Sequence, residues 1–142
     1  MILGKEQLTR LNNMDIKAIN DNYKKINGFD YINGIVIDEA NKEIVKAHIE
    51  VSEKSNNPWG IVHGGAIFGL ADTAIGVLCY ADDKKCVTID ANINYLKPCK
   101  KAARVEATKI KTGKTIGVYK AEVYNEDDEL SAVMTSNYYN IN

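Results

Sequence analysis

The sequence has little cysteine, little proline and few histidines. Its 142 residues include two prolines, two histidines and three cysteines, which are Cys79, Cys86 and Cys99. An odd number of cysteines, without CxxC spacing and without a ligand pattern shared with the histidines, argues against a disulfide framework and against a zinc site. We therefore expect reduced thiols, no bound metal and a cytoplasmic protein.

The sequence also lacks an excess of charge of one sign. Eighteen Lys and Arg residues against nineteen Asp and Glu residues give a net charge of -1. This balance provides no general positive field, so we expect neither nucleic acid nor an anionic membrane surface as a partner. The most apolar run, residues 66–81, is interrupted by Asp72 and is shorter than the roughly 20 residues of a membrane span. The stretch MILGKEQLTRLNN lacks the apolar segment of a secretory signal.

The apolar content is sufficient for a folded domain. Hydrophobic residues make up 45% of the chain and charged residues 26%, which is typical of globular proteins. The length fits one domain of about 100–200 residues. We therefore predict a single domain over residues 1–142.

The hydrophobic pattern predicts two helices and six strands. Apolar residues at helical spacing predict an amphipathic helix over about residues 5–26, with a break near Asn12 and Asn13. Residues 65–81 are apolar on every side, which is typical of a buried helix. Short apolar or alternating runs predict strands at residues 34–37, 44–51, 86–96, 102–110, 115–124 and 130–139.

A helix that is apolar all round must be surrounded by other elements. The loops between the last four predicted strands are short enough for antiparallel hairpins. We therefore predict an α+β fold in which a curved antiparallel sheet wraps around the helix at residues 65–81. In the strand at residues 86–96 the alternation is strict, and it places apolar and polar side chains on opposite faces.

One carboxylate, that of Asp72, lies inside the predicted buried helix. An ionised carboxylate is strongly disfavoured in apolar surroundings unless it is paired or hydrogen-bonded. Two interpretations follow. Either Asp72 is structural, bonded to a loop backbone or placed at a wet contact between subunits, or it is a general base or nucleophile.

The tripeptide His63-Gly64-Gly65 stands at the start of the same helix. The first N–H groups of a helix lack intrahelical acceptors and lie at the positive end of the helix dipole. Glycines let a ligand approach these groups closely, and such groups are suited to a carbonyl oxygen that gains charge during acyl transfer. The alternative is a plain loop-to-helix turn capped by His63.

These features together resemble a known family. The stretch NPWGIVHGGAIFGLADTAIG is similar to the signature of the hotdog-fold thioesterases of the phenylacetate-degradation (PaaI-like) group, within the 4-hydroxybenzoyl-CoA thioesterase superfamily. His63 stands nine residues before Asp72, and Asn57 stands six residues before His63. The segments TIDANINYLKP and GKTIGVYKAEVYN are similar to strands of that group, so the likeness runs from about residue 33 to 139. The resemblance implies a hotdog fold.

The resemblance also implies roles for individual residues. Asp72 matches the carboxylate that attacks the thioester or activates water, and Gly64 matches the residue whose N–H polarises the thioester carbonyl. Asn57 and His63 match the asparagine and histidine of the substrate site. Thr88 aligns with a hydroxyl that, in relatives, the partner subunit contributes near the carboxylate.

The same resemblance implies an acyl-CoA substrate and an oligomer. It predicts a homodimer with Asp72 and Gly64 facing each other from different subunits, and a dimer of dimers as the full assembly. It implies no metal and no redox cofactor. The acyl group is expected to be aromatic or of short to medium length.

Three further residues are candidates for substrate contacts. Gly65 adjoins the predicted carbonyl site, and Trp59 is a candidate for lining the acyl pocket, with anchoring of its loop against the core as the alternative. Lys97 is a candidate for the coenzyme A phosphates, although lysines at strand ends are usually just solvated.

We therefore predict an acyl-CoA thioesterase with Asp72 as base or nucleophile and Gly64 as oxyanion donor. Two alternatives use the same fold. One is an acyl-CoA-binding module without catalysis, and the other is a hydratase or dehydratase that changes the acyl chain and leaves the thioester intact.

Overall fold

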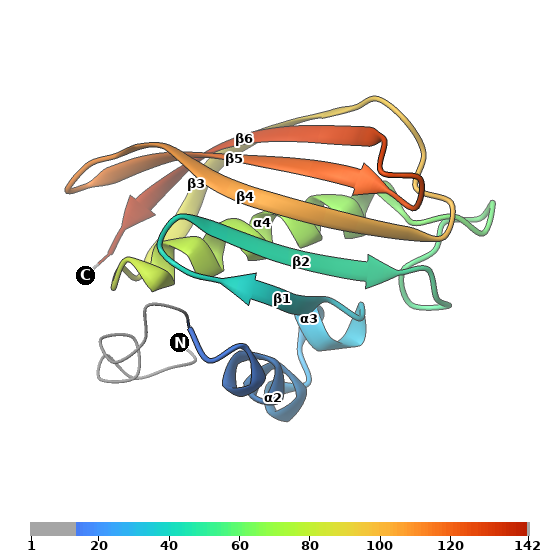
Figure 1. Cartoon of the computed structure of the whole chain (residues 1–142), viewed down its shortest axis with the longest axis horizontal. Helices are drawn as coiled ribbons and strands as arrows, with labels where there is room; N and C mark the ends of the chain where they lie inside the picture. Colours follow the sequence, from blue (N-terminus) through green and yellow to red (C-terminus); the bar gives the residue numbers. More distant parts are fainter. Residues whose placement is uncertain (1–13, 142) are drawn as a thin grey trace.

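Six antiparallel strands form one curved sheet around a long helix in the computed structural model, which describes residues 14–141 (Figure 1). The strand order is β1-β2-β4-β5-β6-β3. This arrangement confirms the predicted α+β architecture. The elements are α2 (Ile16–Ile26), α3 (Phe29–Ile32), β1 (Val36–Ala40), β2 (Ile44–Glu50), α4 (Gly64–Ala81), β3 (Cys86–Tyr95), β4 (Ala102–Thr112), β5 (Ile116–Asn125) and β6 (Leu130–Asn140).

Helix α4 is the central helix, and it begins one residue earlier than predicted. Its N-cap is His63, whose Nδ1 accepts the Gly65 N–H at 2.8 Å. It is long and apolar enough to cross a membrane by composition, but 61% of it is buried inside the protein, as in a core helix. Its burial is not complete, which corrects the prediction of a fully surrounded helix. A partly exposed stripe at helical spacing contains Phe68, Gly69, Asp72, Thr73 and Gly76.

The helix predicted over residues 5–26 is only partly tested, because residues 5–13 lie outside the described residues. Helix α2 begins at Ile16, since the Asp15 side chain accepts the Ala18 N–H at 3.1 Å and caps the first turn. Residues 14 and 15 are therefore not helical, contrary to the prediction. The helix ends at Ile26, as predicted. The four-residue helix α3 was not predicted, because one turn is too short to show a helical period.

The boundaries of the other strands lie within two residues of the prediction, whereas β1 is displaced toward the C-terminus. It covers residues 36–40 instead of 34–37, because Gly34 follows α3 in a left-handed conformation, with φ 78°, and turns the chain before the strand begins.

The two edges of the sheet differ. At the β1 edge, the Asn20 side chain donates to the Ile37 carbonyl and accepts from the Ile37 N–H, both at 2.9 Å. Helix α2 therefore occupies hydrogen-bonding groups that an edge strand otherwise leaves open. Within residues 14–141, no strand pairs with the outer edge of β3.

Strand β3 also departs from the predicted alternation. A bulge between Thr88 and Asp90 interrupts its pairing with β6, and a bulge shifts which side chains share a face. Val87, Ile89 and Tyr95 are about half exposed, at 49%, 50% and 50%. The prediction of strict alternation is therefore wrong, and β3 presents apolar side chains to solvent at an open edge.

Candidate active site

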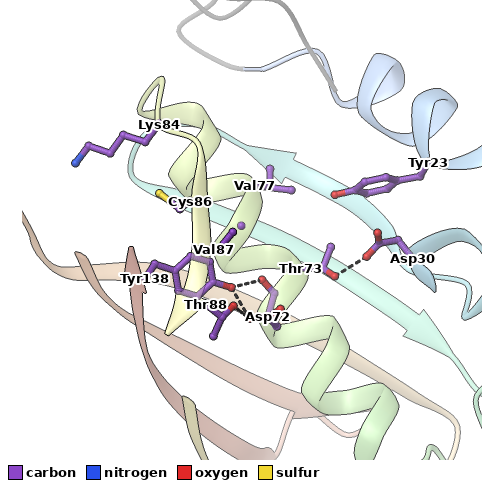
Figure 2. Close-up of a pocket in the computed structure, with 11 residues that line it drawn as sticks. Tyr23, Asp30, Asp72, Thr73, Val77, Lys84, Cys86, Val87, Thr88 and Tyr138 are labelled. Carbon is purple, nitrogen blue, oxygen red and sulfur yellow. Dashed lines mark hydrogen bonds between the residues drawn. The ribbon is translucent and has the colours of Figure 1, made fainter. Parts of the chain in front are cut away.

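The Asp72 side chain lines a cavity of about 350 Å³ beside α4. Figure 2 shows Thr88 and Tyr138 approaching its carboxylate from the sheet, while Asp30 and Tyr23 lie nearer Thr73. The cavity therefore joins the sheet side of α4 to its α2–α3 side. Its lining residues are Tyr23, Asp30, Asp72, Thr73, Gly76, Val77, Lys84, Cys86, Val87, Thr88 and Tyr138.

Two hydroxyl groups donate to the same oxygen of the Asp72 carboxylate. Thr88 Oγ1 donates to Asp72 Oδ1 at 2.8 Å, and the Tyr138 hydroxyl lies 2.5 Å from the same atom. These hydrogen bonds offset the cost of placing a carboxylate on a core helix. No residue in the described part of the chain donates to Oδ2, which leaves that oxygen for a ligand or water.

Thr88 reaches Asp72 within one chain. The expectation that the partner subunit supplies this hydroxyl is therefore wrong for the contact seen here. The physical reason is that β3 lies beside β6 with Thr88 opposite Tyr138, and both side chains line the same cavity as Asp72.

A second carboxylate, Asp30, lines the same cavity. Thr73 Oγ1 donates to Asp30 Oδ1 at 2.6 Å and fixes α3 against α4. Burial, followed by the negative charge of Asp30, raises the pKa of Tyr23 above its ordinary value, so its hydroxyl stays protonated. The α2–α3 side of the cavity is therefore polar.

The start of α4 presents one unoccupied backbone donor. The Gly65 N–H is taken by the His63 ring, which confirms the capping alternative for His63. The Gly64 N–H has no acceptor among the described residues. Gly64 and Lys97 line a second hollow of about 330 Å³, where the Tyr95 hydroxyl donates to the Gly64 carbonyl at 2.7 Å. Of the two glycines, Gly64 is thus the one with an N–H free for a ligand.

The loop before α4 carries Asn57 and Trp59. Asn57 Oδ1 accepts from the N–H groups of Trp59, at 2.9 Å, and Ile61, at 3.3 Å, so this side chain shapes the loop. Its amide nitrogen donates to no described residue. Trp59 is 83% exposed, so it does not anchor the loop against the core of this chain, and its role in lining an acyl pocket stays a prediction.

The site residues lie in two groups within one chain. The carboxylate half-site contains the predicted Asp72 and Thr88 together with Tyr138, which was not predicted, and the amide half-site contains Gly64 with the adjoining His63. Gly64 and Asp72 are eight residues apart on one helix, a separation of about 12 Å at 1.5 Å per residue. One chain therefore cannot bring both groups to the same carbonyl.

The comparisons with known proteins identify the family. The model of the "Thioesterase superfamily" matches residues 60–132. An esterase-named protein of Haemophilus influenzae is 31% identical over 104 residues, which cover 70% of this chain and 75% of the relative. The chain belongs to the thioesterase superfamily.

Solved structures of this superfamily share the fold. The crystal structure of thioesterase HI1161 from Haemophilus influenzae has a TM-score of 0.82 at 27% identity and covers 91% of this chain and 92% of that one. The Escherichia coli PaaI protein has a TM-score of 0.77 at 24% identity, with 87% and 92% covered. Mouse acyl-coenzyme A thioesterase 13 is 27% identical over 107 residues, which are 72% of this chain and 76% of the relative. The solved structures confirm the hotdog fold, and the family model and the named relatives support a hydrolase.

Lys97 forms an ion pair with Glu129. Its ammonium group, together with a hydrogen bond from Asn125, lowers the pKa of the exposed Glu129 carboxyl. Lys97 thus has a structural partner at the rim of the second hollow, and its contact with coenzyme A phosphates stays a prediction.

Sequence reasoning missed Tyr138, Asp30 and Tyr23. Tyr138 lies outside the range matched by the family model. One signal was present: in β6, Met134, Ser136 and Tyr138 alternate onto the buried face, and a buried tyrosine hydroxyl usually requires a partner.

Proposed function

We propose that this protein is an acyl-CoA thioesterase, which hydrolyses a thioester to coenzyme A and a free carboxylic acid at a site shared by two subunits. The observation that carries the proposal is the separation of the two half-sites along α4. Each half-site has a group with an open hydrogen-bonding position, Asp72 Oδ2 in one and the Gly64 N–H in the other. A thioester carbonyl needs both kinds of group.

In the proposed reaction, the thioester oxygen accepts the Gly64 N–H at the positive end of α4. Asp72 acts through Oδ2 by one of two routes. Either it takes a proton from water as the water attacks the acyl carbon, or it attacks that carbon itself and forms an anhydride that water then opens. In both routes the carbon–sulfur bond breaks, the thiol leaves with a proton, and one water is consumed. Neither route requires a metal or a redox cofactor.

The open edge of β3 supports a dimer as the catalytic unit. An unpaired edge with half-exposed Val87, Ile89 and Tyr95 is a favourable surface for a second copy. A two-fold contact along this edge runs the two α4 helices in opposite directions. The N-terminus of one helix then approaches the middle of the other, so that Asp72 meets Gly64 of the partner subunit. A dimer of dimers is the larger assembly that we propose.

The cavity beside Asp72 supports a compact acyl group. Its volume of about 350 Å³ lies at the lower end of the range of small-molecule pockets, about 300–1,000 Å³. We therefore propose aromatic or short- to medium-chain acyl groups as substrates.

The test is thiol release from a panel of aryl- and alkyl-acyl-CoA substrates, with the products identified by mass spectrometry. The proposal predicts free coenzyme A and the unchanged carboxylic acid in equal amounts. An altered acyl chain on an intact thioester would identify a hydratase or dehydratase instead. Binding of acyl-CoA without thiol release would identify a binding module.

A further inference from the structure

We propose that Tyr138 is a positioning residue of this site, whose hydroxyl works with that of Thr88 to hold Asp72 Oδ1 and so present Asp72 Oδ2 to the reacting groups. The inference rests on the proposed thioesterase function and deepens it. It concerns a residue on β6 at the far end of the chain, 66 residues after Asp72.

The Tyr138 ring is fixed by its surroundings. It is only 3% exposed, and it packs against the Tyr119 ring in an edge-to-face arrangement with centroids 5.6 Å apart. A buried aromatic side chain has little rotamer freedom. The Tyr138 hydroxyl is therefore held in place by the core before any ligand arrives.

The hydroxyl points at Asp72, and the Thr88 hydroxyl lies beside it. It lies 2.8 Å from the Asp72 backbone oxygen and 2.5 Å from Asp72 Oδ1. The carboxylate oxygen is the stronger acceptor because it is charged. Burial, followed by the charge of Asp72, raises the pKa of Tyr138, so the hydroxyl keeps its proton and acts as a donor.

Thr88 completes the arrangement from the neighbouring strand. Thr88 and Tyr138 are directly paired in the β3–β6 ladder, and the β-bulge follows immediately after Thr88. A bulge of this kind re-aims a side chain at a site edge. Two donors on one oxygen, one of them the buried Tyr138 hydroxyl, set the rotation of the carboxylate. This rotation decides where Oδ2 points. An error of about 1 Å in the position of a reacting group can reduce a rate by about a hundredfold.

Other titratable groups share the cavity without bonding to Asp72. Tyr23 on α2, Asp30 on α3, Lys84 before β3 and Cys86 on β3 line it, and none of these four has a hydrogen bond or ion pair with the Asp72 side chain. Cys79, on α4 itself, interacts with Tyr119 and Cys86. A change in the pH profile that appears when the Tyr138 hydroxyl is removed is therefore assigned to its contact with Asp72.

The experiment is a kinetic comparison of wild type, Tyr138→Phe and Tyr119→Phe. Tyr119 is the matched control, because it is 1% exposed in the same core and its hydroxyl contacts Cys79 instead of Asp72. We expect Tyr138→Phe to lower kcat by about 10- to 100-fold, the range for a hydrogen bond to a charged group, with KM within about twofold. The acid limb of its pH–rate profile should move to higher pH, because the ionised carboxylate has lost a donor. Tyr119→Phe should retain kcat and the wild-type profile.

A purely structural role for Tyr138 would give a different result. It would lower the fraction of active protein and the melting temperature, and it would leave the pH profile of the remaining activity unchanged. Either that result or an unchanged kcat in Tyr138→Phe overturns the inference, while thiol release by the wild type still supports the proposed function.

A crystal structure of Tyr138→Phe tests the inference without turnover. We expect the Asp72 carboxylate to rotate away from its wild-type position or to occupy more than one rotamer. A carboxylate that keeps its position overturns the inference. Absence of thiol release in the wild type would overturn the proposed function, and the crystal structure would still decide whether Tyr138 positions Asp72.

Discussion

Thr88 and Tyr138 stand opposite each other on β3 and β6, and both donate to one oxygen of Asp72. The pairing of the two strands thus fixes the position of a side chain on the helix that they cover. A sheet can do this because directly paired residues on one face have Cβ atoms only about 5 Å apart. The catalytic carboxylate that we propose is consequently held by the sheet, although it belongs to α4.

The first prediction concerns the hydroxyl of Thr88. Thr88→Val keeps the shape of the side chain and removes its hydrogen bond to Asp72, so we expect kcat to fall by about 10-fold or more. Thr88→Ser keeps the hydroxyl and should retain most of the activity. Steady-state kinetics on the best acyl-CoA of the panel check this. Equal rates for the valine and serine variants would show that the hydroxyl has no role.

The second prediction concerns the backbone N–H of Gly64. Gly64→Pro removes this group at the first position of α4, where helices tolerate proline. The preceding residue, His63, has φ -65° and ψ 138°, which is compatible with a following proline. Loss of one oxyanion donor should lower kcat by about 100- to 1,000-fold.

Gly64→Ala is the control for this change, because it keeps the N–H. The added Cβ would meet the Tyr95 ring at 3.5 Å, an ordinary van der Waals contact. We expect the alanine variant to stay within a few-fold of wild type, on the scale of small packing changes. Wild-type kcat in a folded Gly64→Pro protein would remove Gly64 from the mechanism.

The third prediction concerns stability at high pH. Burial is the main cause that raises the pKa of Tyr23, Tyr119 and Tyr138 above the ordinary value of about 10. Above pH 10 the unfolded chain loses these protons while the folded chain keeps them, so the free energy of unfolding falls as the pH rises. The stabilisation is complete below about pH 10.

Denaturant unfolding at several pH values from about 8 to 11 checks this prediction. Above about pH 10, the free energy of unfolding should fall with a slope that approaches about 1.4 kcal/mol per pH unit for each buried tyrosine. Tyrosinate absorbance should appear together with loss of structure. Tyrosinate that forms in the folded protein near pH 10, without loss of stability, would contradict it.

Local pattern was sufficient for the core of the fold and for half of the site. The helix at residues 65–81 could be predicted because these residues are apolar at every angle around a helix. Asp72 was identified because it carries the charge within that run. The capping role of His63 was one of the two interpretations that its place before two glycines allowed. These are features of short range, which a sequence displays directly.

Contacts between residues far apart in the chain could not be predicted from local pattern. The hydroxyl of Tyr138 meets Asp72 across 66 residues, and nothing near either residue indicates the other. The bulge after Thr88 follows from the β3–β6 register, and the alternation of residue types in β3 hides it. The exposure of Val87 and Ile89 follows from the place of β3 at the sheet edge, which depends on the whole topology.

The most direct test of a shared thioesterase site is complementation between two inactive variants. Asp72→Asn removes the carboxylate and Gly64→Pro removes the donor, and each protein alone should release almost no thiol. Co-expressed with different tags, they form hybrid dimers in which one of the two sites is intact. A random mixture of the subunits should recover about a quarter of the wild-type activity, since half of the dimers are hybrids with one working site. Hybrid dimers without activity, or an Asp72→Asn protein that turns over at the wild-type rate, would contradict the account.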